Sequence, residues 1–274
     1  MKRLILSNPP DSGGIIRLCG EDYHYLVRVK RLKPGMLFNA LLPCGKEAKI
    51  NILSTTDNVL VGENLNQENH PDIIGNSYNL PQIEIFQGLA KANKMDLIIR
   101  QAAECGIMAV VPFESEYSAV RSGINSDKNG NKLQRWKKIV REGRQQSASL
   151  TETEVRNPCS FKALLEYWES LKNEYHKPLG ILLHQDNLSE GTPQRLEKNS
   201  FHGYLEDNPD FIALAVGPEG GFSPREAEMF LEAGFKALKM GNNVLRCETA
   251  ALYACAAAQT ILLERETWSP RIKE

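Results

Sequence analysis

A glycine-rich segment between a buried run and a helix-capping pattern places the strongest constraint on this fold. Residues 211–216 are continuously apolar, as expected of a strand covered on both faces of a parallel sheet. The glycine-rich loop 217–221 follows the run. Ser223 and Glu226 then have the spacing of a capping box, with Pro224 at the first helical position. Open α/β sheets bind ligands at the carboxyl ends of their strands, so the loop predicts a ligand site or a tight structural turn.

The residues of the loop restrict the kind of ligand. No lysine follows Gly221, so the loop is not a P-loop, and its glycines do not have the G-x-G-x-x-G spacing. Glu219 would repel a pyrophosphate group. The loop therefore favours a neutral or cationic ligand. A dinucleotide-dependent oxidoreductase is the weakest alternative, because no acidic residue follows a true G-x-G-x-x-G at the expected distance.

A second segment repeats the order of strand, loop and helix. Residues 235–240 form a strand candidate, a Gly/Asn loop follows, and residues 249–263 form a long Ala-rich helix candidate. This order brings Arg246, Glu248 and Thr249 to a helix start. A salt bridge with a helix cap would explain these residues. Two such loops at one sheet edge favour a ligand pocket instead.

The region after residue 80 has the alternation of an α/β domain. A predicted strand over 82–90 and an apolar run over 107–111 flank a predicted helix, and a further apolar run covers 179–183. Asn93 is the expected N-cap of that helix and Gly106 its left-handed C-terminal residue. Pro112 is expected to end the second strand, and residues 122–133 and 188–209 are expected to be polar connections.

The first 66 residues have a different pattern. Short strands over 36–42, 48–53 and 59–61, separated by turn residues, predict a small barrel or meander. A helix is expected over 21–32, and the polar stretch 67–79 is the expected domain boundary.

Composition excludes several classes of protein. The formal net charge of −1 excludes a generally basic nucleic-acid coat, so any RNA surface must be a local patch. The six cysteines form no C-x-x-C pair and no histidine pair has metal spacing, so neither a metal site nor a disulfide framework is expected. No apolar run approaches the ~20 residues of a membrane span, and the N-terminus lacks a signal peptide, so the protein is expected to be cytoplasmic.

Two motifs carry a resemblance to a known family. GPEGGFSPREAE and VLRCETAAL, in this order near the C-terminus, resemble the RsmE family of 16S rRNA uracil-N3 methyltransferases, members of the SPOUT superfamily. Weaker similarity extends the resemblance over nearly the whole chain, through residues 24–35, 91–107, 112–116 and 146–147.

The resemblance implies a fold and a function. The fold is α/β: a C-terminal SPOUT α/β knot with a trefoil-knotted parallel sheet over 80–274, and an N-terminal PUA-like β-barrel over 1–72. The function is methylation of a uridine at N3 in 16S rRNA, free or in the 30S subunit, with S-adenosyl-L-methionine as cofactor. A homodimer with its active site at the subunit interface is also implied, with no membrane and no metal.

The resemblance also implies roles for individual residues. The cofactor is expected to contact Leu183, His184, Gly217, Pro218, Glu219, Gly220, Gly221, Met240, Gly241, Asn242, Leu245, Arg246 and Thr249. The expected RNA contacts are His24, Arg28, Arg31, Lys33, Lys91, Lys94 and Arg144. Arg246 is predicted to stabilise the developing uracil anion and orient the substrate. Glu248 is predicted to act as general base or to hold Arg246 in place.

Four positions that are usually basic in the family hold uncharged residues here, namely Gln101, Tyr117, Ser149 and Asn243. These changes remove cations from positions expected to meet RNA, whereas the cofactor motifs are intact. The alternative function is therefore a non-catalytic or retargeted RNA-binding relative that keeps the cofactor fold.

Overall fold

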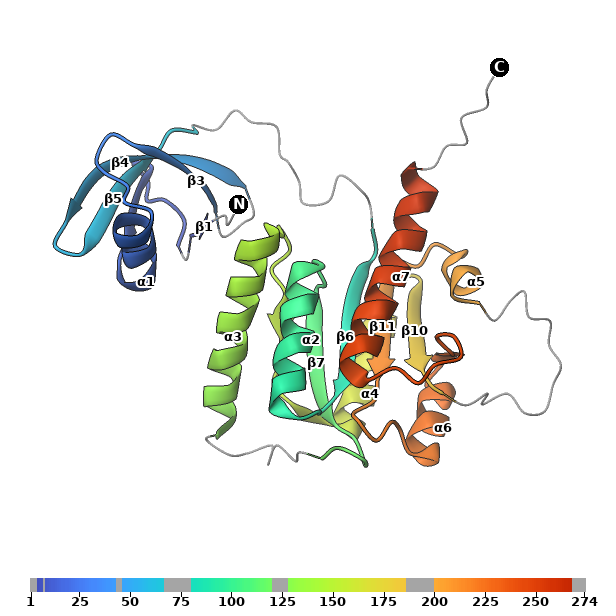
Figure 1. The fold of residues 1–274 in the computed structure, drawn as a ribbon. Helices are drawn as coiled ribbons and strands as arrows, with labels where there is room; N and C mark the ends of the chain where they lie inside the picture. The colour runs from blue at the N-terminus through green and yellow to red at the C-terminus, as the bar shows by residue number, and fades with distance from the viewer. Residues whose placement is uncertain are drawn as a thin grey trace, which may run out of the picture. The chain divides into compact units, whose positions relative to one another are not determined.

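The computed structural model describes residues 4–6, 8–42, 46–66, 80–119, 128–185 and 200–267. The chain divides into two compact units. The first comprises Met1–Ser77 with Arg144–Glu152, and the second comprises Tyr78–Gly143 with Thr153–Glu274. Figure 1 shows the strands of the first unit in blue and those of the second from green to orange. The predicted boundary over 67–79 lies outside the described residues.

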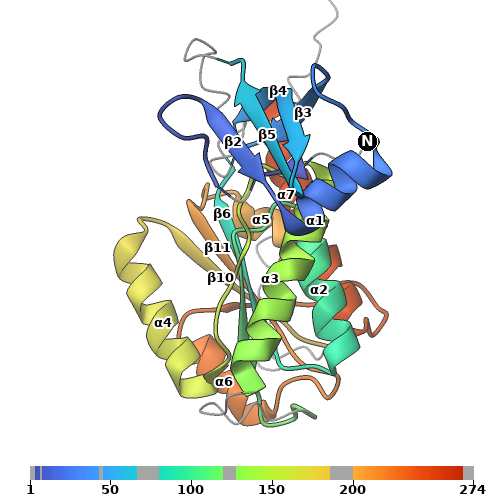
Figure 2. The same ribbon diagram turned by 90° about the vertical axis from the view of Figure 1, so that its left-hand side faces the viewer.

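The first unit is built on one curled sheet with the strand order β1-β3-β4-β5-β2. Its strands are β1 (Leu4–Ile5), β2 (Ile15–Leu18), β3 (Leu37–Leu41), β4 (Glu47–Thr56) and β5 (Val59–Asn64). All pairs are antiparallel except β1 with β3. Ile16, Ile50 and Leu60 form part of its core. The three predicted strands are confirmed, and the sheet forms a curled half-barrel (Figure 2), while the PUA-like barrel stays a prediction.

The helix of the first unit is shorter than the prediction over 21–32. Helix α1 (Gly20–Tyr23) passes directly into a π-helix, η1 (His24–Val29). Arg31 has a left-handed backbone with φ of 57°, which no helix continues, so the helix ends before it.

The second unit contains a parallel sheet with the strand order β12-β10-β11-β6-β7-β8, and β9 also pairs with β7. Its strands are β6 (Gln82–Gly88), β7 (Ala109–Glu114), β8 (Glu154–Val155), β9 (Cys159–Ser160), β10 (Pro178–Leu183), β11 (Phe211–Val216) and β12 (Lys236–Leu238). Every pairing is parallel, which confirms the predicted α/β class. As a result, the carboxyl ends of β12, β10 and β11 lie side by side.

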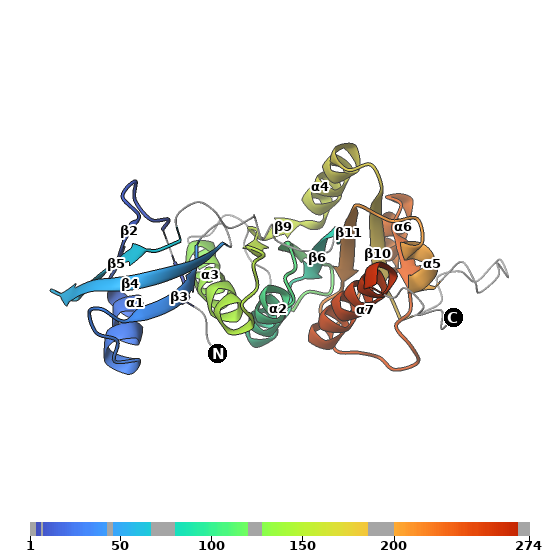
Figure 3. The same ribbon diagram turned by 90° about the horizontal axis from the view of Figure 1, so that it is seen from above.

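Helices cover both faces of this sheet. They are α2 (Ala92–Glu104), α3 (Lys128–Ser147), α4 (Phe161–Glu174), α5 (Phe201–Leu205), α6 (Pro224–Glu232) and α7 (Cys247–Thr267). Figure 3 shows α2, α3 and α7 on one face and α4 and α6 on the other. Each face has its own core, one rich in aliphatic residues under α2 and α7, the other rich in aromatic residues under α4 and α6. Within the described part of the chain, no helix is long and apolar enough to cross a membrane.

Several local predictions differ from the structure. Asn93 is not the N-cap of α2: Lys91 occupies that position, without a side-chain cap bond. Pro112 does not end β7 but pairs with Gln87 inside it. It lies between the parts of β7 that pair with β8 and β9, where its missing N–H costs no ladder bond on that side.

Other local predictions hold or need new bounds. Gly106 has the predicted left-handed conformation, with φ of 69°. The two expected polar connections are partly helical, because α3 occupies residues 128–133 and α5 lies within 188–209.

Candidate functional site

A pocket lies where the carboxyl ends of β12, β10 and β11 meet. Its volume of about 570 Å³ falls within the range of small-molecule sites, roughly 300–1,000 Å³. The pocket is lined by every predicted cofactor residue except Thr249. Thr249 instead lies exposed in the first turn of α7. The two loops selected from the sequence thus converge on one cavity.

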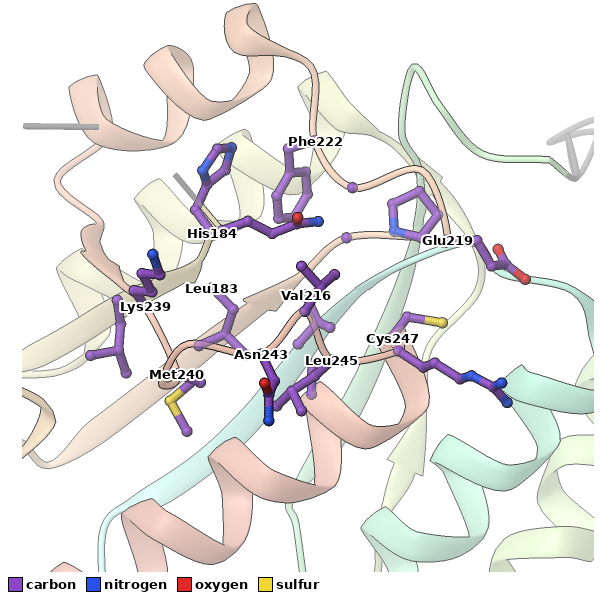
Figure 4. Close-up of a pocket in the computed structure, with 18 of the residues that line it drawn as sticks. Leu183, His184, Val216, Glu219, Phe222, Lys239, Met240, Asn243, Leu245 and Cys247 are labelled. Carbon is purple, nitrogen blue, oxygen red and sulfur yellow. The ribbon is translucent and has the colours of Figure 1, made fainter. Parts of the chain in front are cut away.

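Apolar side chains line the middle of the pocket, and charged side chains lie toward its ends. Leu183, Val216 and Leu245 line its middle (Figure 4). Lys239 and Met240 lie toward one end and Glu219 toward the other. Such a slot can hold a flat apolar group between polar ends.

The glycine-rich loop has little free space around its backbone. A Cβ on Gly217 would lie 3.0 Å from the Cα of Gly221, which itself has φ of 71°. A Cβ on Gly88, at the end of β6, would lie 2.5 Å from Pro218 Cδ. A Cβ on Gly220 would lie 2.8 Å from the Cβ of Tyr117. Only glycine fits these positions without displacing the loop.

The predicted capping box is confirmed, and it also binds a second loop. Ser223 Oγ accepts from the Glu226 N–H, and Glu226 Oε2 accepts from the Ser223 N–H at 3.0 Å. The same carboxylate accepts from Ser115 Oγ at 3.0 Å and from the Glu116 N–H at 2.9 Å. Glu226 is 5% exposed. This buried carboxylate therefore joins the start of α6 to the loop after β7.

A group of charged and polar side chains lies at the end of the pocket that contains Glu219. Lys94 Nζ lies 3.6 Å from Glu219 Oε1 and 3.4 Å from Glu248 Oε2. Glu219 Oε1 also accepts from the Lys91 N–H at 3.1 Å. The Cys247 thiol donates to Glu248 Oε2 at 3.3 Å. We call Lys94, Glu219, Glu248 and Cys247 the rim cluster.

Burial and the contacts within the rim cluster shift the pKa of Glu248, Cys247 and Lys94. Burial opposes ionisation of Glu248, but hydrogen bonds from its own N–H and the Cys247 thiol, with the charge of Lys94, lower its pKa. Burial raises the pKa of Cys247 to about 12. Burial also acts against the charge of Lys94, yet the surrounding acidic groups raise its pKa. The ion pair of Glu248 is with Lys94, and both roles predicted for Glu248 stay predictions.

The predicted RNA contacts fall into two groups. His24, Arg28, Arg31 and Lys33 are exposed in the first unit, and Lys91 is exposed in the second. Lys94 instead belongs to the rim cluster. Arg144 is 5% exposed, burial lowers its pKa, and it donates to the Leu150 carbonyl at 3.4 Å. Burial weighs against RNA binding by Arg144, which stays a prediction.

The pocket also has lining residues that were not among the predicted cofactor contacts. They are Lys94, Gln185, Phe222, Leu238, Lys239, Asn243, Val244, Cys247 and Ala250, together with Val216. Most lie within two residues of a predicted cofactor contact, and Phe222, Val244, Cys247 and Ala250 lie inside the two quoted motifs. No group of three or more potential metal ligands occurs among the described residues.

Fold and site together define an α/β protein that binds a small ligand at the carboxyl edge of a parallel sheet. The family model of the RNA methyltransferase domain matches residues 77–259, so the chain belongs to the RNA methyltransferase domain family. The matched residues cover most of the second unit and every residue that lines its pocket.

Known proteins resemble the chain over nearly its whole length. Ribosomal RNA small subunit methyltransferase E of Bacillus subtilis (strain 168) is 29% identical over 253 residues, which are 90% of this chain and 91% of that protein. Ribosomal RNA small subunit methyltransferase E 2 of Borreliella burgdorferi is 28% identical over 263 residues, covering 96% and 98%. These similarities confirm the resemblance that the two motifs indicated.

A solved structure shares the fold. The crystal structure of a ribosomal RNA small subunit methyltransferase E from Neisseria gonorrhoeae, bound to S-adenosyl methionine, matches with a TM-score of 0.75. The match covers 95% of this chain and 98% of that one at 24% identity.

Proposed function

We propose that this protein transfers a methyl group from S-adenosyl-L-methionine to N3 of a uridine in 16S rRNA of the small ribosomal subunit. Membership of the RNA methyltransferase family and the names of the relatives in B. subtilis and B. burgdorferi support the reaction and the class of RNA. The observation that carries the proposal is the convergence of the 217–221 and 240–246 loops on one pocket.

The pocket residues fit this cofactor. The apolar middle suits an adenine ring, and a cavity of about 570 Å³ suits a nucleoside with an amino-acid tail. The cofactor carries a sulfonium and no phosphate, which agrees with two carboxylates and one lysine in the rim cluster. When bound, the cofactor supplies an electrophilic methyl group.

Arg246 is the residue proposed to act on the substrate. It lines the pocket, precedes the first residue of α7 and is exposed, so its guanidinium is accessible to RNA. Uracil must lose the N3 proton during transfer, and a preorganised cation would stabilise the resulting anion. The Glu248 carboxylate is paired with Lys94, and its role as general base stays a prediction.

The broader organisation is proposed from the same family resemblance. Residues 1–72 would form a PUA-like RNA-binding barrel and residues 80–274 a trefoil-knotted SPOUT domain in a cytoplasmic homodimer. Leu97 on α2 and Tyr253 on α7 are 38% and 55% exposed, and these helices contact each other. Apolar residues exposed on neighbouring helices support an interface there, which sedimentation analysis would test.

Methyl transfer to defined RNA tests the proposal. Free 16S rRNA and 30S particles from a strain lacking the modification would be incubated with the protein and methyl-labelled cofactor. We expect label in small-subunit RNA, recovered as 3-methyluridine on nucleoside analysis. Arg246→Ala is expected to lower kcat about 10²- to 10³-fold. Cofactor binding without RNA methylation would favour the non-catalytic alternative, and full turnover by Arg246→Ala would exclude its proposed role.

A further inference from the structure

One lysine joins three segments at the mouth of the pocket. Lys94 lies in the first turn of α2, Glu219 in the glycine-rich loop and Glu248 in the first turn of α7. The Lys94 ammonium lies 3.6 Å and 3.4 Å from the two carboxylates. We propose that Lys94 is a positioning residue, which holds the glycine-rich loop and the start of α7 at the separation that the cofactor requires. This inference rests on the proposed function.

The surroundings of Lys94 favour this role over the RNA contact expected from the sequence. Its side chain is 23% exposed, and the paired carboxylates are 24% and 13% exposed. An RNA phosphate would have to replace carboxylates that Lys94 already contacts. Lys91, three residues earlier at the N-cap position of α2, has an exposed side chain and donates its backbone N–H to Glu219. The two lysines therefore have different roles in this proposal: Lys94 positions the loops of the cofactor pocket, and Lys91 is the predicted RNA contact.

The charge of the rim cluster explains why the lysine is needed. Glu219 and Glu248 come from different loops, and Lys94 lies within 3.6 Å of both. Without Lys94 two carboxylates would face the same space with no cation between them, and like charges repel. The 217–221 loop and the start of α7 would then separate, and both contribute to the pocket lining.

Two ligands distinguish positioning from a simple charge effect. S-adenosylmethionine has one more positive charge than its demethylated product, S-adenosylhomocysteine. If Lys94 acted only through its charge, removing it would strengthen binding of the cationic cofactor relative to the product. If Lys94 positions the loops, both ligands lose affinity by the same factor.

The experiment is calorimetric titration of both ligands without RNA. Lys94→Met is expected to weaken both about tenfold or more, as expected on loss of hydrogen bonds to charged groups. Lys94→Arg, which keeps the cation, should recover most of the affinity. Lys137→Met is the matched control, since Lys137 is an exposed lysine of α3 outside the pocket lining, and it should leave both dissociation constants unchanged. Combining Lys94→Met with Glu248→Gln should cost less than the product of the two single effects, because the changes remove one interaction.

Clear results would overturn the inference. Unchanged cofactor affinity in Lys94→Met, together with a salt slope of RNA binding that falls by about 0.7, would identify an RNA contact instead. Tighter binding of S-adenosylmethionine alone would identify a charge effect. If Lys94→Met does not fold by circular dichroism, Glu219→Gln and Glu248→Gln each remove one partner, and unchanged affinity in both would refute the positioning role. Failure of the wild-type protein to bind the cofactor would instead refute the proposed function.

Discussion

Replacing Glu226 by glutamine should destabilise the second unit strongly for so small a change. The Glu226 carboxylate is 5% exposed and accepts three hydrogen bonds, from Ser115 Oγ and from the N–H groups of Glu116 and Ser223. Glutamine has the same shape but only one accepting oxygen. Its amide nitrogen would therefore face at least one buried N–H donor.

The magnitude follows from these contacts. A hydrogen bond to a charged group contributes about 1.5–3 kcal/mol, and leaving a buried donor unsatisfied costs about 1–3 kcal/mol. Because glutamine keeps some of the bonds, we expect Glu226→Gln to lower the free energy of unfolding by about 2–4 kcal/mol. The change should also weaken cofactor binding, because Ser223 lies two residues after the glycine-rich loop.

Urea unfolding followed by tryptophan fluorescence would measure this loss. The three tryptophans, Trp136, Trp168 and Trp268, all belong to the second unit, so the signal reports on the affected part of the chain. Glu228→Gln is the matched control, since Glu228 lies exposed on the same helix, and it should change stability by less than about 0.5 kcal/mol. Equal unfolding midpoints for the two variants would show that the carboxylate network does not stabilise the fold.

Three further changes test other parts of the second unit. Gly180→Ala would place a Cβ 2.8 Å from the buried ring of Phe235, and we expect urea unfolding to show a loss of about 1–3 kcal/mol. Gly220→Ala would place its Cβ 2.8 Å from Tyr117 Cβ, so calorimetry should show weaker cofactor binding, and unchanged affinity would mean that the loop adapts at no cost. The pKa of Glu248 is lowered in the folded protein, so its ionised form adds stability above the ordinary carboxyl pKa, and this stability is lost as pH falls through the lowered value. The stability difference between wild type and Glu248→Gln should therefore be present at pH 7 and vanish in acid, whereas a difference that persists in acid would point to packing.

Local patterns were sufficient to predict much of the fold. The continuous apolar run 211–216 coincides with β11, and the spacing of Ser223 and Glu226 gave a capping box with both of its hydrogen bonds. Both depend on residues close in sequence. The tolerance of Pro112 inside β7 depends instead on where β8 and β9 pair along its other edge, so no local pattern could have revealed it.

The site shows the same division between local and distant contacts. Glycine-rich loops after apolar runs predicted the cavity, because parallel strands bring their carboxyl ends to one edge. The partner of Glu248 could not be predicted in this way. Arg246 is two residues away in sequence, yet the ion pair is formed with Lys94, from a helix that starts more than 150 residues earlier. In the sequence, Lys94 follows Lys91 near a helix start, which is a pattern typical of an RNA contact. The structure shows the two carboxylates that Lys94 contacts instead.

Two of the four uncharged residues at usually basic family positions, Tyr117 and Asn243, lie at or beside the pocket. Tyr117 packs its Cβ side against Gly220, and Asn243 lines the cavity, so both changes lie near the proposed reaction site. The lining includes Lys94, Lys239 and Arg246, but Lys94 is already paired with two carboxylates. Under the proposed function, stabilisation of a uracil anion then depends more on Arg246 than it would in a relative with an arginine at position 243. Restoring that cation by Asn243→Arg in the Arg246→Ala background should recover part of the lost methyl transfer, and no recovery would show that position 246 acts through geometry that position 243 cannot supply.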